Sequence, residues 1–206
     1  MYLKRMQLGV YAVNCYLIAC DETKEAAVID PGGDASEILR KVEENGFNLK
    51  FIILTHGHGD HIGGVPQIKE KTKAQILIHK EDEYLIKSAE KNLSSVMSGP
   101  DIGFMADKLL EDGDKITLGQ LQLEVIHTPG HTYGGICIKV QNVMFTGDTL
   151  FAQSIGRTDF EGGSFDEIIK SIKNKILIYD DSTRVLPGHG PESTIGIERM
   201  KNPFLR

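Results

Sequence analysis

The feature that most constrains this chain is a histidine-rich segment, Thr55-His56-Gly57-His58-Gly59-Asp60-His61. It follows an apolar run at 51–54 that predicts a strand covered on both faces. Side chains alternate along extended backbone, so His56 and His58 point the same way and can reach one metal ion. The intervening glycines let the backbone bend, so that Asp60 and His61 turn toward a second point. These polar residues would be costly to bury without a partner, and the segment predicts a metal site at the end of a strand.

Three further turns each carry one candidate ligand, and each turn follows an expected strand. A catalytic zinc site needs three protein ligands and an open position. The candidates supply two such sets, and one additional carboxylate has two oxygens with which to bridge two ions. The two sets and the bridging residue are His56, His58 and His131; Asp60, His61 and His189; and Asp148.

Hydrophobic periodicity predicts strands and then helices, twice over, with no linker and no repeat. Strands are expected at 2–8, 14–20, 26–29, 51–54, 75–79, 115–118, 121–128, 135–140, 143–147 and 185–186. Helices are expected at 34–44, 61–71, from 81 onward, 164–177 and 192–201. Ser164 and Glu167 predict a capping box, and 92–113 predicts a helical excursion or flap. The simplest arrangement is one α/β domain over residues 1–206, a four-layer αββα sandwich.

Charge and cysteine content restrict the partners. The net charge of −6 disfavours a phosphate backbone as a ligand, so no nucleic acid is expected. The three cysteines are odd in number and widely spaced, which favours a reducing, cytoplasmic environment over a disulfide framework. No stretch is long and apolar enough to span a membrane, so no membrane association is expected. The oligomeric state is left open.

The pattern of residues 55–61, T-H-x-H-x-D-H, together with His131, Asp148 and His189, resembles the metallo-β-lactamase superfamily. The resemblance implies the αββα fold and two metal ions held by these seven side chains, with Asp148 bridging. The segments 145–151, 156–160 and 198–205 resemble the glyoxalase II (hydroxyacylglutathione hydrolase) group, especially its short, single-domain bacterial relatives. β-Lactamases of the superfamily generally carry a different ligand set.

This resemblance implies a hydrolase of small-molecule thioesters, in which a hydroxide bridging the metals attacks the thioester carbonyl. Asp60 and Asp148 are the expected catalytic carboxylates, with Asp60 able to accept a proton as product forms. The leaving thiolate needs no strong acid, because a thiol has a pKa of about 8.5. Zinc is the expected metal, and iron and manganese suit the same donors.

The chain departs from glyoxalase II in two places. The additional C-terminal helical domain of that group is not found in these residues, and its Gly-Lys-Phe-Tyr-Glu-Gly stretch is replaced at 156–162. Arg157 retains a cation there and is the candidate for binding a substrate carboxylate, with a salt bridge to Asp159 as the alternative. Tyr133 is a second substrate-binding candidate or a packing residue. His127 is expected to be a surface or packed histidine.

Two other activities use a similar constellation. Persulfide dioxygenases of the superfamily hold one iron with two histidines and an aspartate, here His56 or His58 with His131 and Asp148. His189 favours two metals instead, because it completes the second set. A lactonase would need all seven ligands. The metal count per chain distinguishes the first alternative, and a substrate panel distinguishes the second.

Overall fold

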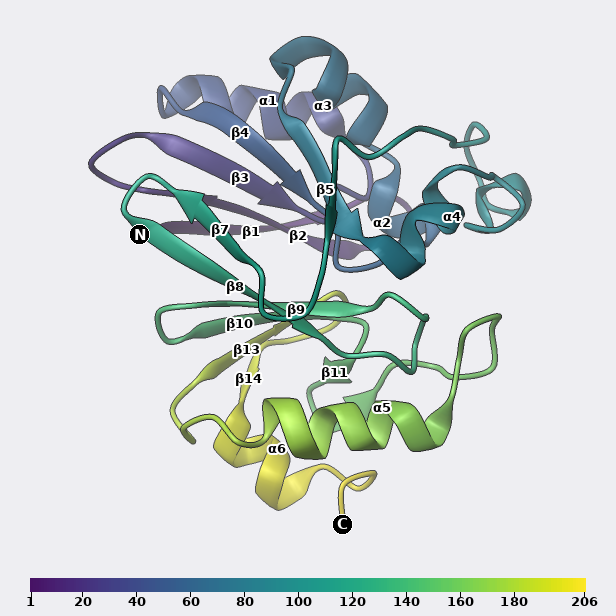
Figure 1. The fold of residues 1–206 in the computed structure, drawn as a ribbon. Helices are drawn as coiled ribbons and strands as arrows, with labels where there is room; N and C mark the ends of the chain where they lie inside the picture. The colour runs from purple at the N-terminus through teal and green to yellow at the C-terminus, as the bar shows by residue number, and fades with distance from the viewer.

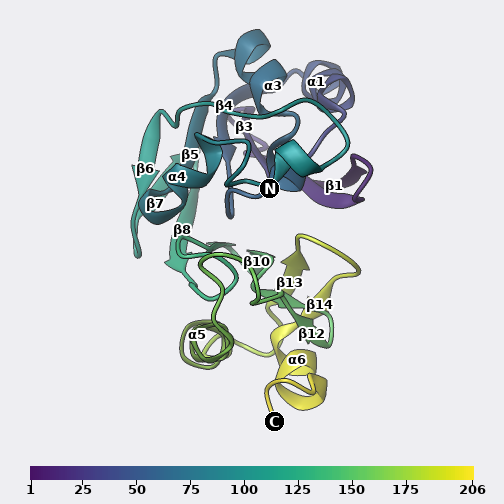
Figure 2. The same cartoon turned by 90° about the vertical axis from the view of Figure 1, so that its right-hand side faces the viewer.

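The computed structural model describes all 206 residues, and they form two mixed β-sheets stacked face to face (Figure 1). The first sheet has the order β1-β2-β3-β4-β5-β6, and the second has the order β14-β13-β10-β9-β8-β7. Helices α1 and α3 lie on the outer face of the first sheet, and α5 and α6 lie beyond the second (Figures 1 and 2). The predicted four-layer αββα sandwich is thereby confirmed.

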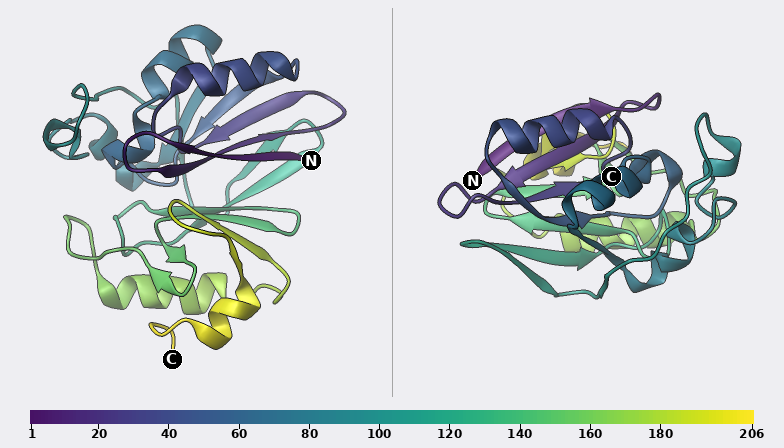
Figure 3. Two further views of the ribbon diagram at one scale, coloured as in Figure 1. Left: turned by 180° about the vertical axis from the view of Figure 1, so that it is seen from behind. Right: turned by 90° about the horizontal axis from the view of Figure 1, so that it is seen from above.

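The first half of the chain builds the first sheet and its helices. Its strands are β1 (Tyr2–Leu8), β2 (Val13–Ala19), β3 (Glu25–Ile29), β4 (Asn48–Ile53), β5 (Gln75–His79) and β6 (Lys108–Leu110). Its helices are α1 (Ala35–Glu44), α2 (Gly59–Ile62), α3 (Val65–Thr72) and α4 (Glu83–Ile86), with short 3₁₀ turns at Lys80–Asp82 and Ser94–Val96. Seen from above, α1 lies across the strands of this sheet (Figure 3).

The second half of the chain repeats the plan. Its main strands are β7 (Lys115–Leu118), β8 (Leu121–His127), β9 (Ile136–Val140), β10 (Val143–Gly147), β13 (Arg184–Pro187) and β14 (Ser193–Thr194). A small hairpin is formed by β11 (Leu150–Phe151) and β12 (Ser154–Ile155). Helix α5 (Phe165–Ser171) continues into a π-helical turn, Ile172–Ile176, and α6 is Ile195–Lys201.

Alternating side chains fill three apolar layers. In β2, Cys15 and Leu17 face the helices of the first half, whereas Tyr16 and Ile18 face the second sheet. A third cluster packs α5 and α6 against the second sheet. Because both faces of the central strands β2 and β3 are covered, their side chains are buried and mostly apolar.

Three local predictions need correction. The helix expected at 61–71 is two helices, α2 and α3, separated at Gly63–Gly64. The backbone N–H of Gly64 donates to the carbonyl of Pro31 at 2.7 Å, which takes it out of the helical hydrogen-bond pattern between the two segments. The excursion at 92–113 contains β6, and the β11–β12 hairpin was not predicted.

Ser164 caps α5 by accepting a hydrogen bond from the backbone N–H of Glu167 at 3.3 Å. The other half of the predicted capping box is not formed, because the backbone N–H of Ser164 donates to the carbonyl of Gly130 at 2.8 Å instead. No helix has the length and apolar character needed to cross a bilayer. The parallel register of β3, β4 and β5 brings their carboxyl ends to one edge, and β10 and β13 are likewise parallel in the second sheet. The turns that follow these strands carry the chemistry described next.

Candidate metal centre

The structure brings all seven predicted ligands together. His56 and His58 follow β4, and α2 carries Asp60 and His61. The other three lie in turns after β8, β10 and β13, and they are His131, Asp148 and His189. Side chains separated by up to 133 residues in the sequence therefore meet, because the strands that precede them end at the same edge of the sandwich.

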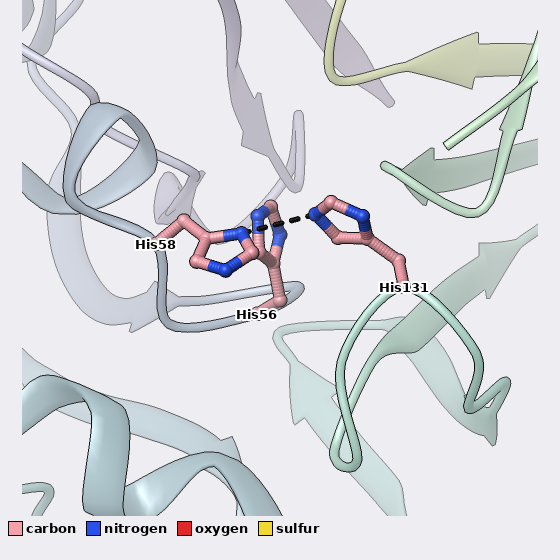
Figure 4. A group of neighbouring side chains, drawn as sticks. All are labelled: His56, His58 and His131. Atoms are coloured by element: carbon pink, nitrogen blue, oxygen red, sulfur yellow. Dashed lines mark hydrogen bonds between the residues drawn. The ribbon is translucent and has the colours of Figure 1, made fainter. Parts of the chain in front are cut away.

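The first half-site consists of His56, His58 and His131, whose rings converge on one point (Figure 4). The Nδ1 of His58 lies 3.0 Å from the Nε2 of His131. The ring centroid of His56 lies 4.9 Å from that of His58 and 4.8 Å from that of His131. Two nitrogens about 2.1 Å from one tetrahedral zinc ion lie about 3.4 Å apart, so this spacing suits a shared ion.

The second half-site consists of Asp60, His61 and His189. The Nε2 atoms of His61 and His189 are 3.3 Å apart. The Oδ2 of Asp60 lies 3.3 Å from the Nε2 of His189 and 3.8 Å from that of His61. This spacing also suits one ion, and here a carboxylate replaces one imidazole.

Asp148 lies between the half-sites. Its Oδ2 is 3.7 Å from the Nε2 of His131 and 3.7 Å from the Nε2 of His189. Its Oδ1 is 3.4 Å from the Nε2 of His61. One carboxylate thus reaches ligands of both half-sites, which is the geometry expected of a bridging residue.

Unpartnered polar atoms show that a cation fits here. The Nε2 of His56 and the Oδ1 of Asp148 are buried and have no hydrogen-bond partner. Buried polar atoms almost always have a hydrogen-bond partner, so two such atoms without a partner in one cluster indicate that a ligand binds there. A divalent ion would satisfy both atoms, and imidazole with carboxylate suits zinc, iron or manganese.

The two half-sites differ in charge. Burial, reinforced by the neighbouring His131, lowers the pKa of His58 to about 3, and burial likewise holds the pKa of His56 well below its usual range. Both rings are therefore neutral at pH 7, as metal ligands must be. Burial opposes a charge on His61 too, but Asp148, Asp60 and Asp30 raise its pKa to about 10. The carboxylates around His61 thus stabilise positive charge at this position, which a metal ion would supply in place of the proton.

Two buried aspartates that the sequence did not single out hold the ligand-bearing turns. Asp30, which directly follows β3, accepts hydrogen bonds from the N–H of Thr55 at 2.8 Å and from its hydroxyl at 2.6 Å. Its Oδ2 also lies 3.2 Å from the Nδ1 of His61. A carboxylate behind a histidine fixes the ring orientation and leaves Nε2 directed at the metal. Asp30 therefore supports the second half-site.

Asp82 supports the first half-site. Its buried carboxylate accepts hydrogen bonds from the N–H of Gly57 at 3.2 Å, the hydroxyl of Thr132 at 2.7 Å and the N–H of Gly134 at 2.6 Å. It thereby ties the turn of His56 and His58 to the turn of His131. The approach is so close that a Cβ at Gly134 would lie 2.5 Å from the backbone nitrogen of Asp82.

Asn14 holds the His189 turn against β2. Its backbone N–H donates to the carbonyl of Gly188 at 2.8 Å, and its side-chain amide donates to that of Pro187 at 3.0 Å. The hydroxyl of Tyr16 donates to the same Pro187 carbonyl at 2.7 Å. The signal for this role was a polar residue inside an otherwise apolar strand.

The candidate substrate-binding residues lie outside the ligand cluster. The guanidinium of Arg157 forms two 2.7 Å hydrogen bonds with Asp159 and stacks 3.7 Å from the ring centroid of Phe160. The backbone carbonyl of Arg157 accepts a 2.8 Å hydrogen bond from the Nδ1 of His131, which leaves Nε2 facing the centre. Tyr133 is exposed beside Tyr84.

A fourth polar cluster, His79, Glu81 and His127, lies apart from the seven ligands. The two imidazoles stack with centroids 4.0 Å apart and planes 15° from parallel. Lone pairs in parallel rings run side by side and do not converge on one ion. His127 also donates through its Nε2 to the carbonyl of Tyr133 at 2.8 Å, so this pair has a packing role.

Comparison with known proteins agrees with this geometry. A family model for the metallo-β-lactamase superfamily matches residues 8–189. Hydroxyacylglutathione hydrolase GloC of Haemophilus influenzae is 38% identical over 210 residues, which cover 100% of this chain and 98% of that protein.

Two solved structures are also similar. The BLEG-1 B3 metallo-β-lactamase superposes with a TM-score of 0.94 at 38% identity, covering 99% of each chain. TTHA1623, solved in a di-iron-bound form, gives a TM-score of 0.87 at 31% identity, covering 98% of this chain and 100% of that one. Motif, fold and relatives agree, and the chain belongs to the metallo-β-lactamase superfamily.

Proposed function

We propose that this chain is a two-metal hydrolase of small-molecule thioesters, similar in activity to hydroxyacylglutathione hydrolase. The observation that carries the proposal is the placement of Asp148 between two complete sets of three ligands. The 38% identity to GloC over the whole chain supports the thioester as the substrate class. Zinc is the proposed metal, with iron or manganese as the alternatives.

Two divalent ions bound here would lower the pKa of a water molecule and polarise the substrate carbonyl. The residues of the chain set the conditions for that chemistry. The buried, neutral histidines offer their lone pairs at fixed positions. Asp60, although buried, has its carboxyl pKa lowered by His61 and His189, so it is ionised, as a carboxylate metal ligand must be, and it can accept a proton as product forms.

The chain presents no obvious proton donor to a leaving group, and a thioester does not need one. Cleavage of the C–S bond releases a thiolate, and an ordinary thiol has a pKa of about 8.5. A β-lactam or another amide releases nitrogen, which must be protonated as it leaves. The likeness to BLEG-1 makes β-lactam hydrolysis the second candidate, and this difference in leaving group favours the thioester.

A persulfide dioxygenase would need one iron, and its ligand set would leave Asp60, His61 and His189 without a role. These three side chains converge as closely as the first set does. A two-metal hydrolase uses all seven side chains, so we prefer it. A lactonase would share the metal centre and differ only in substrate.

The test is hydrolysis of S-D-lactoylglutathione by chain loaded separately with zinc, iron and manganese, followed by loss of thioester absorbance. A β-lactam and a lactone are assayed in parallel. We expect thioester turnover that His56→Ala and Asp148→Ala abolish and that His127→Ala, a histidine outside the centre, preserves. Turnover of the β-lactam or lactone alone, by chain holding two ions, would exclude the thioester proposal.

A further inference from the structure

A cavity of about 210 Å³ opens beside the second half-site. Its lining includes the turn between β1 and β2, with Val10 and Tyr11 at the tip of that turn, and residues of the segment 94–102. Asp60 also lines it. We call this space the hairpin cavity. In Figure 1 the segment leading from α4 to β6 projects beyond the sandwich, so this part of the lining does not belong to either sheet.

Met97 brings the segment 94–102 close to the metal-binding segment. A Cβ built on Gly59 would lie 3.0 Å from the sulfur of Met97, so the thioether packs directly over the backbone between His58 and Asp60. Methionine is flexible and adapts its shape to an apolar ligand. Its position makes it the residue that sets how far a bound group can extend from Asp60.

The lining of the hairpin cavity consists mainly of apolar and uncharged residues. Apart from Asp60, a candidate metal ligand, it contains no charged side chain. Val10 is 76% exposed and Tyr11 is 45% exposed, and the protein leaves these apolar groups at the cavity mouth uncovered. Isolated apolar side chains on a surface need no explanation, but several around one concave opening mark a binding site.

The opening on the other side of the centre is different. It is a hollow of about 120 Å³ beside His58, lined by Lys91, Phe160 and Glu161 among others. Lys91 and Glu161 form an ion pair there at 2.8 Å. A thioester has one end that is usually charged and water-soluble, the thiol carrier, and one end that is often apolar, the acyl group. The apolar opening suits the acyl group, and the charged opening suits the carrier.

We propose that the hairpin cavity holds the acyl group of the thioester and that Met97 limits its length; this rests on the thioester activity proposed above. The acyl group lies between the β1–β2 turn and Met97, and the thiol carrier leaves on the His58 side. A cavity of 150 Å³ holds benzene, so about 210 Å³ holds roughly eight carbon atoms. The substrate class is therefore a short acyl thioester.

The test uses a series of glutathione thioesters with acyl chains from acetyl to decanoyl. Each buried methylene raises kcat/KM by about fourfold until the cavity is full. We expect kcat/KM of the wild type to rise with chain length, and then to fall beyond roughly eight carbons. Met97→Ala shifts that optimum to longer chains, and Tyr11→Ala reduces the preference for butyryl over acetyl by about fourfold. Met105→Ala, an exposed methionine outside the cavity, keeps the wild-type profile.

The outcomes separate the two proposals. No turnover of any thioester by wild type with two ions bound overturns both. Thioester turnover in which Met97→Ala and Tyr11→Ala keep the wild-type chain-length profile, as the control Met105→Ala does, overturns only the proposal for the acyl cavity. Tyr11 is an exposed turn residue, so its variant keeps the test valid if Met97→Ala fails to fold.

Discussion

The two half-sites of the candidate metal centre consist of different kinds of ligand. The first consists of three buried histidines, of which His56 and His58 are neutral at pH 7, and Asp82 hydrogen-bonds to the turns that carry them. The second combines a carboxylate with two histidines, is supported by Asp30, and is more open, since the side chain of His189 is 31% exposed. Only Asp148 is common to both.

Under the proposed two-metal function, this difference would give the two ions different tasks. The first half-site favours a metal ion by geometry, because its histidine nitrogens lie on turns that Asp82 holds in place. The second favours a metal ion by charge, because several carboxylates lie close together. The second half-site also lies beside the hairpin cavity through Asp60. The first half-site is therefore expected to be the more rigid one, and the second to be the one that meets substrate.

Removal of the shared ligand gives the largest expected effect. Asp148→Ala removes oxygens that reach both half-sites, so we expect the metal content to fall below one ion per chain and hydrolysis to fall by roughly a thousandfold or more. Elemental analysis and initial rates on the same preparation measure both quantities. Retention of two ions by this variant would show that Asp148 does not bridge.

Removal of one ligand from each half-site gives the next effect. His131→Ala and His189→Ala should each leave about one ion per chain, because each opens one set of three and spares the other. We expect hydrolysis to fall by roughly a hundredfold or more in both variants. If either variant loses both ions together, the half-sites are not separable units and the comparison fails.

Asp82 predicts a pH dependence of stability in the chain stripped of metal. Burial, only partly offset by its hydrogen bonds, raises the pKa of Asp82 from 3.8 to about 6. The folded chain therefore binds this proton more tightly than the unfolded chain, and the contribution of Asp82 to the free energy of unfolding falls as pH rises from about 4 to about 6. Protonation of Asp82 contributes about 3 kcal/mol to the free energy of unfolding. This contribution is fully present below pH 4 and is absent above pH 6.

Urea unfolding at a series of pH values checks this. Asp82→Asn cannot ionise, so its stability should lack this descending component between pH 4 and 6. Asp101→Asn, at an exposed aspartate, should follow the wild type. Parallel curves for wild type and Asp82→Asn would mean that Asp82 is ionised throughout.

The supporting carboxylates give the smallest effect and the finest test of the comparison. Residues that orient metal ligands typically contribute about 10–100-fold in metal affinity. Asp82→Asn should weaken only the first half-site, because it loosens the turns of His58 and His131. Asp30→Asn should weaken only the second, because it releases His61. Calorimetric titration resolves the two binding steps, and equal weakening of both steps by either variant would contradict this division.

The candidate ligands could be predicted because each lies either in one short sequence segment or directly after a recognisable strand. Four lie within 56–61, and His131, Asp148 and His189 each follow a strand recognisable from its apolar run. Asp30 and Asp82 were not recognised, since a lone aspartate in a turn signals nothing until its partners from other strands are known.

The local errors have the same origin. Separation of the helix expected at 61–71 depends on the carbonyl of Pro31, some thirty residues away in sequence. The strand β6 has only three residues and is defined by pairing with β5. Such features depend on tertiary contacts, whereas the four-layer arrangement follows from periodicity alone.

On the proposed function, two ions in unlike half-sites act together on a thioester. The most direct measurement adds zinc stepwise to metal-free chain and records bound ions and S-D-lactoylglutathione hydrolysis at every step. We predict that activity rises until two ions are bound per chain and then stays constant. Full activity with one ion bound, and no further gain from the second, would contradict the account.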